Sequence, residues 1–371
     1  MDRRHLIYFG PTFTEASRNF RGNHEKERTF AMKQKQKKSF QFIIKKNSFL
    51  LLLSLMMGLF LLSGCGNYES QELGIKRSSE KPASPRIVTT IFPEYDWVRE
   101  ILGDQAKEAE FINLFDKGVD IHSFQPTAND MKEISDCDLF IFVGGESDKW
   151  VEEALKNKSN PRRKVIRLMD LLSDQLQKEE PIEGVKEEKE EEDAEDEHVW
   201  LSLKNAQKII PPLAEALEEL FPQQKNQLQK NAGAYLEKLE ALDQEYEKIT
   251  QAGKRKTLLF GDRFPFLYLT KDYGLKYYAA FSGCSAETEA SFERVSFLAG
   301  KVNEQNLPFI LTIEGSDQKL AKTIIENTAN KDQKISCMNS MQSIHREEIE
   351  KGISYLKIME ENGKVLEKAL N

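Results

Sequence analysis

Two of the five histidines in the 371-residue chain stand where an imidazole could do chemistry. His122 lies in the stretch VDIHSFQP, after a predicted strand, and His198 directly follows the acidic run EEKEEEDAEDE at residues 187–197. Neutral imidazole is a common ligand of zinc and other transition metals, and carboxylates often complete such sites. A single loop histidine is more often a surface or helix-capping residue. The elements that carry the two histidines must therefore show whether they can meet.

Short β-rich runs alternate with helical segments from residue 86 onward. This alternation predicts two α/β lobes, at 86–202 and 253–371, each with a parallel sheet covered by helices. Ligands of open α/β sheets bind outside the carboxyl ends of the strands, where both histidines are expected. The expected strands are 86–91, 108–113, 138–143 and 164–168, then 257–260, 277–281, 309–313 and 334–338. The expected helices are 93–103, 127–135, 149–156, one ending near 271, 291–303, 318–328 and 347–370.

A long helical stretch at 203–252 is expected to join the two lobes. Proline lacks an amide hydrogen, so this stretch should break or kink at its proline positions. Apolar side chains recur in it at spacings of three, four and seven, which predicts one stripe that packs the lobes together. The prolines are Pro211, Pro212 and Pro222, and the stripe is Leu228, Tyr235, Leu239, Leu242, Tyr246 and Ile249.

The charge of the chain argues against nucleic acid as a partner. The formal net charge is -8 and 31% of the residues are charged, whereas phosphate binding needs a clustered positive surface. An acidic chain suits cations better. The run at 187–197 is expected to form a mobile loop that raises the local cation concentration beside His198.

The first 64 residues are expected to be a signal region. Lys45 and Lys46 precede an apolar run at 49–62, which is shorter than the roughly 20 residues of a membrane span. LSGC at 62–65 resembles the lipobox of bacterial lipoproteins, which implies cleavage before Cys65 and lipidation of this cysteine. The alternative is an uncleaved anchor helix. Translation is expected to start at Met32, which leaves His5 and His24 without function, and the polar segment 65–85 is expected to be a flexible tether.

Three stretches carry a resemblance to a known family. TTIFPEYDWVREILGD, GVDIHSFQPTANDMKEISDCDLFIFVG and EHVWLSLKNAQKI resemble the substrate-binding lipoproteins of zinc and manganese ABC importers, and the similarity covers nearly all of 86–371. The resemblance implies two α/β lobes joined by a long rigid helix, with one metal in the cleft between the lobes. It also implies that His122 and His198 are metal ligands.

The other ligands implied by the family fall on less similar residues. The family takes a third ligand from the loop after the first strand of the second lobe, where this chain reads FGDRFPFLYL. An ungapped match places Arg263 at the ligand position, but arginine cannot coordinate a cation. A shift of the alignment by one residue favours Asp262 as the ligand. The alternative is that Asp262 caps the following helix. The fourth ligand falls in LTIEGSDQ, where Glu314 is the better candidate and Asp317, a possible helix cap, is the alternative.

The remaining histidine and the cysteines have simpler interpretations. His345 precedes the final helix and is expected to be exposed or capping. Cys137 starts a buried strand and is expected in the core. An extracytoplasmic setting would allow a disulfide between Cys284 and Cys337, and some zinc-binding relatives carry one in this lobe. Zinc ligation by this cysteine pair is the alternative, although the pair lacks the short CxxC spacing.

The resemblance implies a lipid-anchored, monomeric receptor on the extracytoplasmic face of the cell membrane. It would bind a divalent metal and deliver it to an ABC permease with its ATPase. Zinc is favoured over manganese, because the acidic insertion before HVWLS resembles the zinc branch. A manganese receptor and a surface adhesin or scaffold lipoprotein are the alternatives. An extracytoplasmic metallohydrolase would need an open coordination position and a positioned base, and the chain has no HExxH motif.

Overall fold

Two four-stranded parallel sheets form the framework of the protein. The computed structural model describes residues 84–371 except 180, 184–193 and 286–288. The predicted signal region, the start at Met32, lipidated Cys65 and nearly all of the tether lie outside the described residues. Within the described part of the chain, none of the helices combines the length and the apolar character needed to cross a bilayer.

The first lobe is built on a sheet with the strand order β2-β1-β3-β4. All three strand pairs are parallel, and β3 is buried along its whole length, as both faces of a helix-covered parallel sheet should be. The strands are β1 (Arg86–Thr89), β2 (Glu110–Asn113), β3 (Leu139–Phe142) and β4 (Lys164–Arg167), and the helices are α2 (Phe92–Leu102), α3 (Ala128–Asp136) and α4 (Val151–Lys156). As predicted, Thr127 caps α3.

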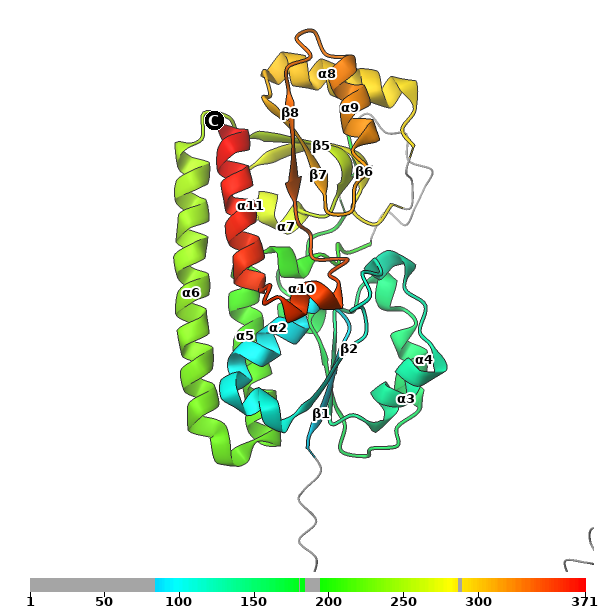
Figure 1. Cartoon of the computed structure of the whole chain (residues 1–371), viewed down its shortest axis with the longest axis vertical. Helices are drawn as coiled ribbons and strands as arrows, with labels where there is room; N and C mark the ends of the chain where they lie inside the picture. The colour runs from blue at the N-terminus through cyan, green and yellow to red at the C-terminus, as the bar shows by residue number, and fades with distance from the viewer. Residues whose placement is uncertain (1–83, 180, 184–193, 286–288) are drawn as a thin grey trace, which may run out of the picture. The chain divides into compact units, whose positions relative to one another are not determined.

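The second lobe repeats the scheme with the strand order β6-β5-β7-β8. Helices α8 and α9 lie against this sheet (Figure 1), and a separate apolar cluster fills the space between them and the sheet. The strands are β5 (Thr257–Phe264), β6 (Lys276–Ser282), β7 (Phe309–Ile313) and β8 (Lys334–Met338). The helices are α7 (Leu267–Asp272), α8 (Phe292–Gln305), α9 (Lys319–Glu326) and α10 (Arg346–Glu350). The prediction of two parallel α/β lobes is confirmed.

The linking segment consists of two helices, where the sequence suggested one interrupted helix. Helix α5 (Leu203–Leu220) packs against α6 (Lys225–Ala252). The break follows from Pro222, because the residue before a proline is driven out of the helical region, and Phe221 has φ -124° and ψ 60°. Pro211 and Pro212 lie inside α5 without ending it.

The predicted closing helix is also divided. Gly352 has φ +82°, a left-handed conformation that favours glycine, and it follows Lys351, the residue that caps the end of α10. Ser354 then caps α11 (Tyr355–Leu370) by accepting the amide hydrogen of Lys357 at 3.3 Å. The final helix therefore begins about two turns later than its periodicity suggests.

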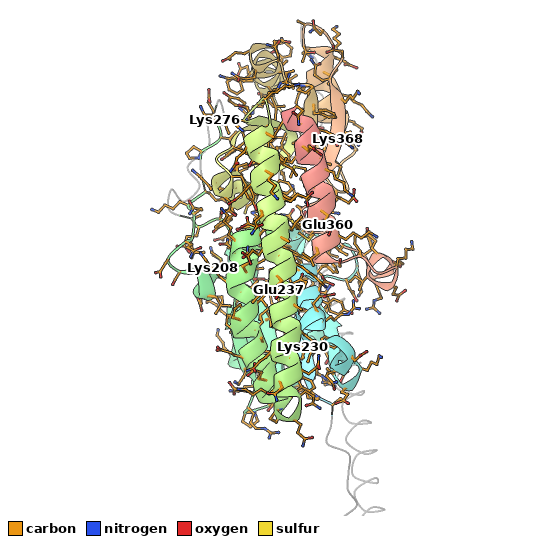
Figure 2. All side chains as sticks on the ribbon, turned by 90° about the vertical axis from the view of Figure 1, so that its left-hand side faces the viewer. Lys208, Lys230, Glu237, Lys276, Glu360 and Lys368 are labelled. Atoms are coloured by element: carbon orange, nitrogen blue, oxygen red, sulfur yellow. The ribbon has the colours of Figure 1, made fainter. Side chains whose placement is uncertain are left out.

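Helices α5 and α11 each lie beside the long helix α6 along one flank of the protein (Figures 1 and 2). The predicted apolar stripe of α6 faces inward, since five of its six members are buried and Ile249 is partly buried. Figure 2 shows charged side chains such as Lys230, Glu237 and Lys368 on the outer face. The stripe is therefore packing surface, as predicted.

Candidate metal site

His122 is presented by a short turn that follows β2. The turn is a single 3-10 turn, Ile121–Ser123, and Ile121 is buried and anchors it in the core. Asp120 caps the turn by accepting the amide hydrogen of His122 at 3.0 Å. The other carboxylate oxygen of Asp120 pairs with the guanidinium of Arg263 on β5. Arg263, which an ungapped match places at the family's third ligand position, thus holds the His122 turn in place from the other lobe.

His198 is completely buried at the entry to the linking helices. Asp196 Oδ1 accepts both the amide hydrogen of His198, at 2.8 Å, and the hydrogen of its ring atom Nδ1, at 3.1 Å. The next residues, Val199–Leu201, are buried in a short 3-10 turn that leads into α5. On the other side of the ring, a Cβ atom at Gly283 would lie 2.8 Å from Cε1 of His198. Only glycine lets the loop after β6 approach the imidazole so closely.

The two imidazole rings face each other through their Nε2 atoms, which are 3.3 Å apart. The other ring nitrogen of His122, Nδ1, lies 2.8 Å from Ser147 Oγ and 3.1 Å from Glu197 Oε1. Ser147 donates its own hydroxyl and amide hydrogens to Glu197, so its oxygen is left to accept from His122. Acceptors on Nδ1 favour the tautomer whose Nε2 carries a lone pair.

Two neutral rings held in this way would point lone pairs at each other across a short distance. The arrangement is favourable when a cation lies between the nitrogens. Two nitrogen ligands of a tetrahedral zinc ion, each about 2.0–2.1 Å from the metal, lie about 3.3–3.4 Å apart. The observed separation of 3.3 Å matches this spacing.

Charged neighbours make the site negative. Burial alone would raise the pKa of Glu197, but the hydrogen bond and charge of His122, the charge of His198 and the Ser147 hydroxyl outweigh it and lower the pKa to about 2. Burial would lower the pKa of His198, yet the charge and hydrogen bond of Asp196 raise it above its ordinary value. Burial would also raise the pKa of Asp120, and the Arg263 guanidinium holds it below the usual range. Glu197 is therefore ionised at neutral pH beside both imidazoles.

Gln342 reaches the same place from the second lobe. Its side-chain Nε2 lies 3.3 Å from His122 Nε2, and its Oε1 is buried without a hydrogen-bond partner among the described residues. Glu314 holds this segment in place, because its carboxylate accepts the amide hydrogens of Ser340 and Gln342 and the Ser340 hydroxyl, at 2.7–3.0 Å. An amide can present either its oxygen or its nitrogen toward His122 by a half-turn.

Four residues together could hold a metal ion. One ligand atom each from His122, Glu197, His198 and Cys284 lie within 4.8 Å of one another. Among the described residues, the cluster therefore unites the two predicted histidines with a carboxylate that the sequence reasoning missed and a thiol that it considered as a ligand only together with Cys337. Glu197 precedes His198 directly, which was a usable signal, whereas neither Cys284 nor Gln342 stands in a recognisable ligand motif.

The predicted oxygen ligands lie outside this cluster. Asp262 belongs to β5, where its carboxylate accepts the amide hydrogens of Arg263 at 2.9 Å and Ile313 at 3.4 Å. Glu314 holds the segment that carries Gln342, as described above. Asp317 accepts the amide hydrogen of Lys319, the first residue of α9, at 2.9 Å and is exposed, as expected of a helix cap.

The expected disulfide is not formed, because Cys284 and Cys337 are both free thiols. The sheet order explains this outcome. Cys284 follows β6 and Cys337 lies on β8, and β5 and β7 stand between these two edges. Three strand spacings amount to about 14 Å, whereas a disulfide requires Cα atoms about 4.4–6.8 Å apart. Cys137 is buried, and His345 is exposed at the N-cap of α10, both as predicted.

The acidic run differs from its expected behaviour at one end. Asp196 and Glu197 are 3% and 1% exposed, so the prediction of a mobile loop over the whole run 187–197 is wrong for these two residues. They pack because each carboxylate receives hydrogen bonds from a histidine. The expected mobile loop at 187–193 lies outside the described residues.

Comparisons with known proteins give a consistent result. Residues 87–369 match the family described as ZnuA, the periplasmic component A of the zinc-uptake complex. The zinc-binding lipoprotein AdcA of Streptococcus pneumoniae is 30% identical over 300 residues, which cover 78% of this chain and 57% of that protein. The chain thus spans little more than half the length of this relative.

Two further proteins match over more of their own length. The high-affinity zinc uptake system protein ZnuA of Bacillus subtilis is 28% identical and is covered to 94%, with 84% of this chain aligned. The crystal structure of the Zn(II)-bound ZnuA-like domain of S. pneumoniae AdcA superposes with a TM-score of 0.61 at 28% identity. It covers 77% of this chain and 99% of that domain.

Proposed function

The chain belongs to the family of the periplasmic component A of zinc-uptake complexes, and from this premise we propose that it is a receptor that binds Zn²⁺ and delivers it to an ABC-type importer. In this proposal zinc is cargo, and the protein binds it without catalysing a reaction. The observation that carries the proposal is the pair of imidazoles whose Nε2 atoms face each other at 3.3 Å. Manganese is the runner-up metal, and nitrogen ligands favour zinc over it.

His122 and His198 are the proposed imidazole ligands. Each has its Nδ1 fixed by an acceptor, which is the usual arrangement around metal-bound histidine. The assignments of Asp262 and Glu314 as further ligands stay predictions. The buried Gln342 could provide an oxygen from the second lobe after rotation of its amide.

We further propose that the receptor is anchored by a lipid on Cys65 and faces the outside of the cell membrane. The name of the S. pneumoniae relative, a zinc-binding lipoprotein, supports this proposal. Its partners would be a permease with its ATPase, to which a monomeric receptor presents the bound ion. Metabolic labelling with a radioactive fatty acid should mark the wild-type chain and leave Cys65→Ala unlabelled.

Zinc titration of single-histidine variants tests the ligand assignment. Apparent zinc-binding energies of about 10–16 kcal/mol shared among four ligands give about 3 kcal/mol for each, or roughly a 100-fold change in affinity. Competition with a zinc-binding dye should therefore show about this loss for His122→Ala and His198→Ala. His345→Ala is the matched control, because His345 is exposed, and it should keep the wild-type affinity. Wild-type affinity in all three variants would contradict the proposal.

A further inference from the structure

We infer that Cys284 supplies a thiolate from the second lobe to the metal held by His122 and His198, and that this ligand biases the site toward zinc and against manganese. The inference rests on the proposed function and deepens it. It adds a ligand that the resemblance to known receptors did not suggest. This ligand would also explain a preference of the site for one metal.

The position of the thiol carries the inference. Cys284 lies in the loop after β6, at the carboxyl end of the second sheet, where ligands of such sheets are bound. Its sulfur lies 3.9 Å from Glu197 Oε1 and within 4.8 Å of a ring nitrogen of each histidine. Tetrahedral nitrogen and sulfur ligands of one zinc ion lie about 3.5–3.6 Å apart, so the sulfur must move toward the Nε2 atoms for all three ligands to share one ion.

The backbone at Gly283, next to Cys284, lies very close to the ring of His198. A Cβ at Gly283 would lie 2.8 Å from His198 Cε1 and 3.0 Å from the carbonyl oxygen of Phe264. Real Cβ atoms are not found at such distances from a buried ring, so a side chain here would push the loop away. Glycine at 283 therefore brings the following residue, Cys284, against the imidazole pair.

The other described cysteines lack such surroundings. Cys137 donates its thiol hydrogen to the carbonyl oxygen of Ile134 at 3.2 Å inside the first lobe. Cys337 is exposed on β8, at the opposite edge of the sheet from Cys284. The thiol of Cys284 instead faces two carboxylates, Glu179 and Glu197, and the histidine pair. This is a setting for a bound cation.

Coordination by sulfur changes the metal preference. Thiolate is a soft ligand that suits zinc, whereas manganese prefers oxygen ligands. When zinc binds, the S–H bond breaks, the sulfur electron pair forms the Zn–S bond, and the proton passes to the solvent. The ion then has ligands from both lobes, so the thiolate also contributes to holding the lobes together.

The competing explanation is that Cys284 only donates a hydrogen bond to its carboxylate neighbours. Cys284→Ser separates the two, because serine keeps a hydrogen-bond donor of similar size but is a poor soft ligand. Cys337→Ser is the matched control at an exposed cysteine. Circular dichroism of each full-length variant confirms that it is folded before metal is added.

Cobalt and zinc are the probes for the full-length protein. Wild type and Cys337→Ser loaded with Co²⁺ should show a thiolate-to-cobalt charge-transfer band in the near ultraviolet, and Cys284→Ser should lose it. Zinc affinity should fall roughly tenfold or more in Cys284→Ser, and manganese affinity should change much less. In zinc-loaded wild type, X-ray absorption should detect one sulfur neighbour at about 2.3 Å, a measurement that needs no variant.

Absence of the band from wild type, or its persistence in Cys284→Ser, overturns the inference. An unchanged ratio of zinc to manganese affinity in Cys284→Ser also overturns it. The proposed function fails separately, if His122→Ala and His198→Ala bind zinc as wild type does. If those two variants lose zinc affinity and Cys284→Ser does not, the proposed receptor function is supported and the thiolate ligand is excluded.

Discussion

Asp196 and Glu197 are neighbours in the chain, and each fixes one of the two imidazoles. Asp196 accepts from His198, the residue two positions later, while Glu197 turns the other way and lies 3.1 Å from Nδ1 of His122. Three consecutive residues thus contain one proposed ligand and both of the carboxylates that orient the pair. The acidic run conceals this arrangement, because a series of charged side chains indicates a solvated loop.

The buried carboxyl of Glu94 should make the stability of the protein depend on pH. It is 0% exposed, and its carboxylate accepts the amide hydrogens of Thr90 at 2.8 Å and Ile91 at 3.3 Å. Burial, followed by the charge of Asp148, raises its pKa from 4.5 to about 8. A raised folded-state pKa stabilises the protein fully below the unfolded pKa, and this contribution is lost as pH rises through the folded pKa.

Glu94→Gln imitates the protonated acid and should remove this dependence. Between about pH 4.5 and 8, the free energy of unfolding of wild type should fall by on the order of 4 kcal/mol more than that of the variant. Urea unfolding at a series of pH values measures the difference. Parallel curves for the two proteins would show that Glu94 is not buried as a neutral acid.

At the scale of elements, the strands were predictable and the ends of the helices were less so. Alternation of apolar runs with helical segments located all eight strands, because parallel strands covered on both faces are short and apolar. Periodicity could not locate the divisions at Phe221 and Gly352, since these depend on single backbone conformations. Strand β5 runs four residues further than expected, to Phe264, and carries Arg263 to Asp120.

The candidate site was predictable only in the first lobe. His122 and His198 stand in motifs whose turns are local in sequence. Glu197 was treated as part of a solvated run, and Cys284 was considered mainly for a disulfide with Cys337, from which the strand order separates it. Gln342 is a neutral amide, and its approach to His122 depends on how two lobes meet, which no local pattern encodes.

The start of α5 offers a test of how an element supports the site. Ser202 is completely buried, accepts the amide hydrogen of Asn205 at 2.9 Å and donates its hydroxyl to Asp272 Oδ2. Ser202→Ala should lose the cap, about 1 kcal/mol, and also strand the Asp272 carboxylate, for a total loss of about 2–3 kcal/mol in unfolding free energy.

Ser291→Ala is the matched control for this measurement. Ser291 caps α8 by accepting the amide hydrogen of Arg294 at 3.2 Å, and its side chain is exposed. Its loss should cost only the cap, about 1 kcal/mol, in the same denaturant titration. Equal losses in the two variants would mean that the bond from Ser202 to Asp272 contributes nothing.

At the scale of the whole molecule, contacts between the two lobes converge around the histidines. Arg263 on β5 pairs with Asp120, Gln342 approaches His122, and the indole of Trp200 donates to the carbonyl oxygen of Ser340 at 2.8 Å. The proposed metal site and the lobe interface are therefore the same region. A substitution at the lobe interface should therefore change the affinity for the metal.

Arg263 places a positive charge beside a cation site, which opposes metal binding. Arg263→Met should bind zinc roughly 3- to 10-fold more tightly, measured by competition with a zinc-binding dye at low salt. Arg346→Met is the matched control, because Arg346 makes an exposed ion pair with Asp116, and its affinity should stay within about twofold. Weaker binding by Arg263→Met would show that bracing of Asp120 outweighs the repulsion.

The central claim, that zinc lies between the two imidazoles, is tested most directly by anomalous diffraction from crystals of the zinc-loaded protein. Data collected on either side of the zinc absorption edge locate the metal without relying on any variant. The account predicts one strong anomalous peak about 2.0–2.1 Å from Nε2 of both His122 and His198. A fully occupied zinc ion elsewhere in the protein, with no peak between these two nitrogens, would contradict it.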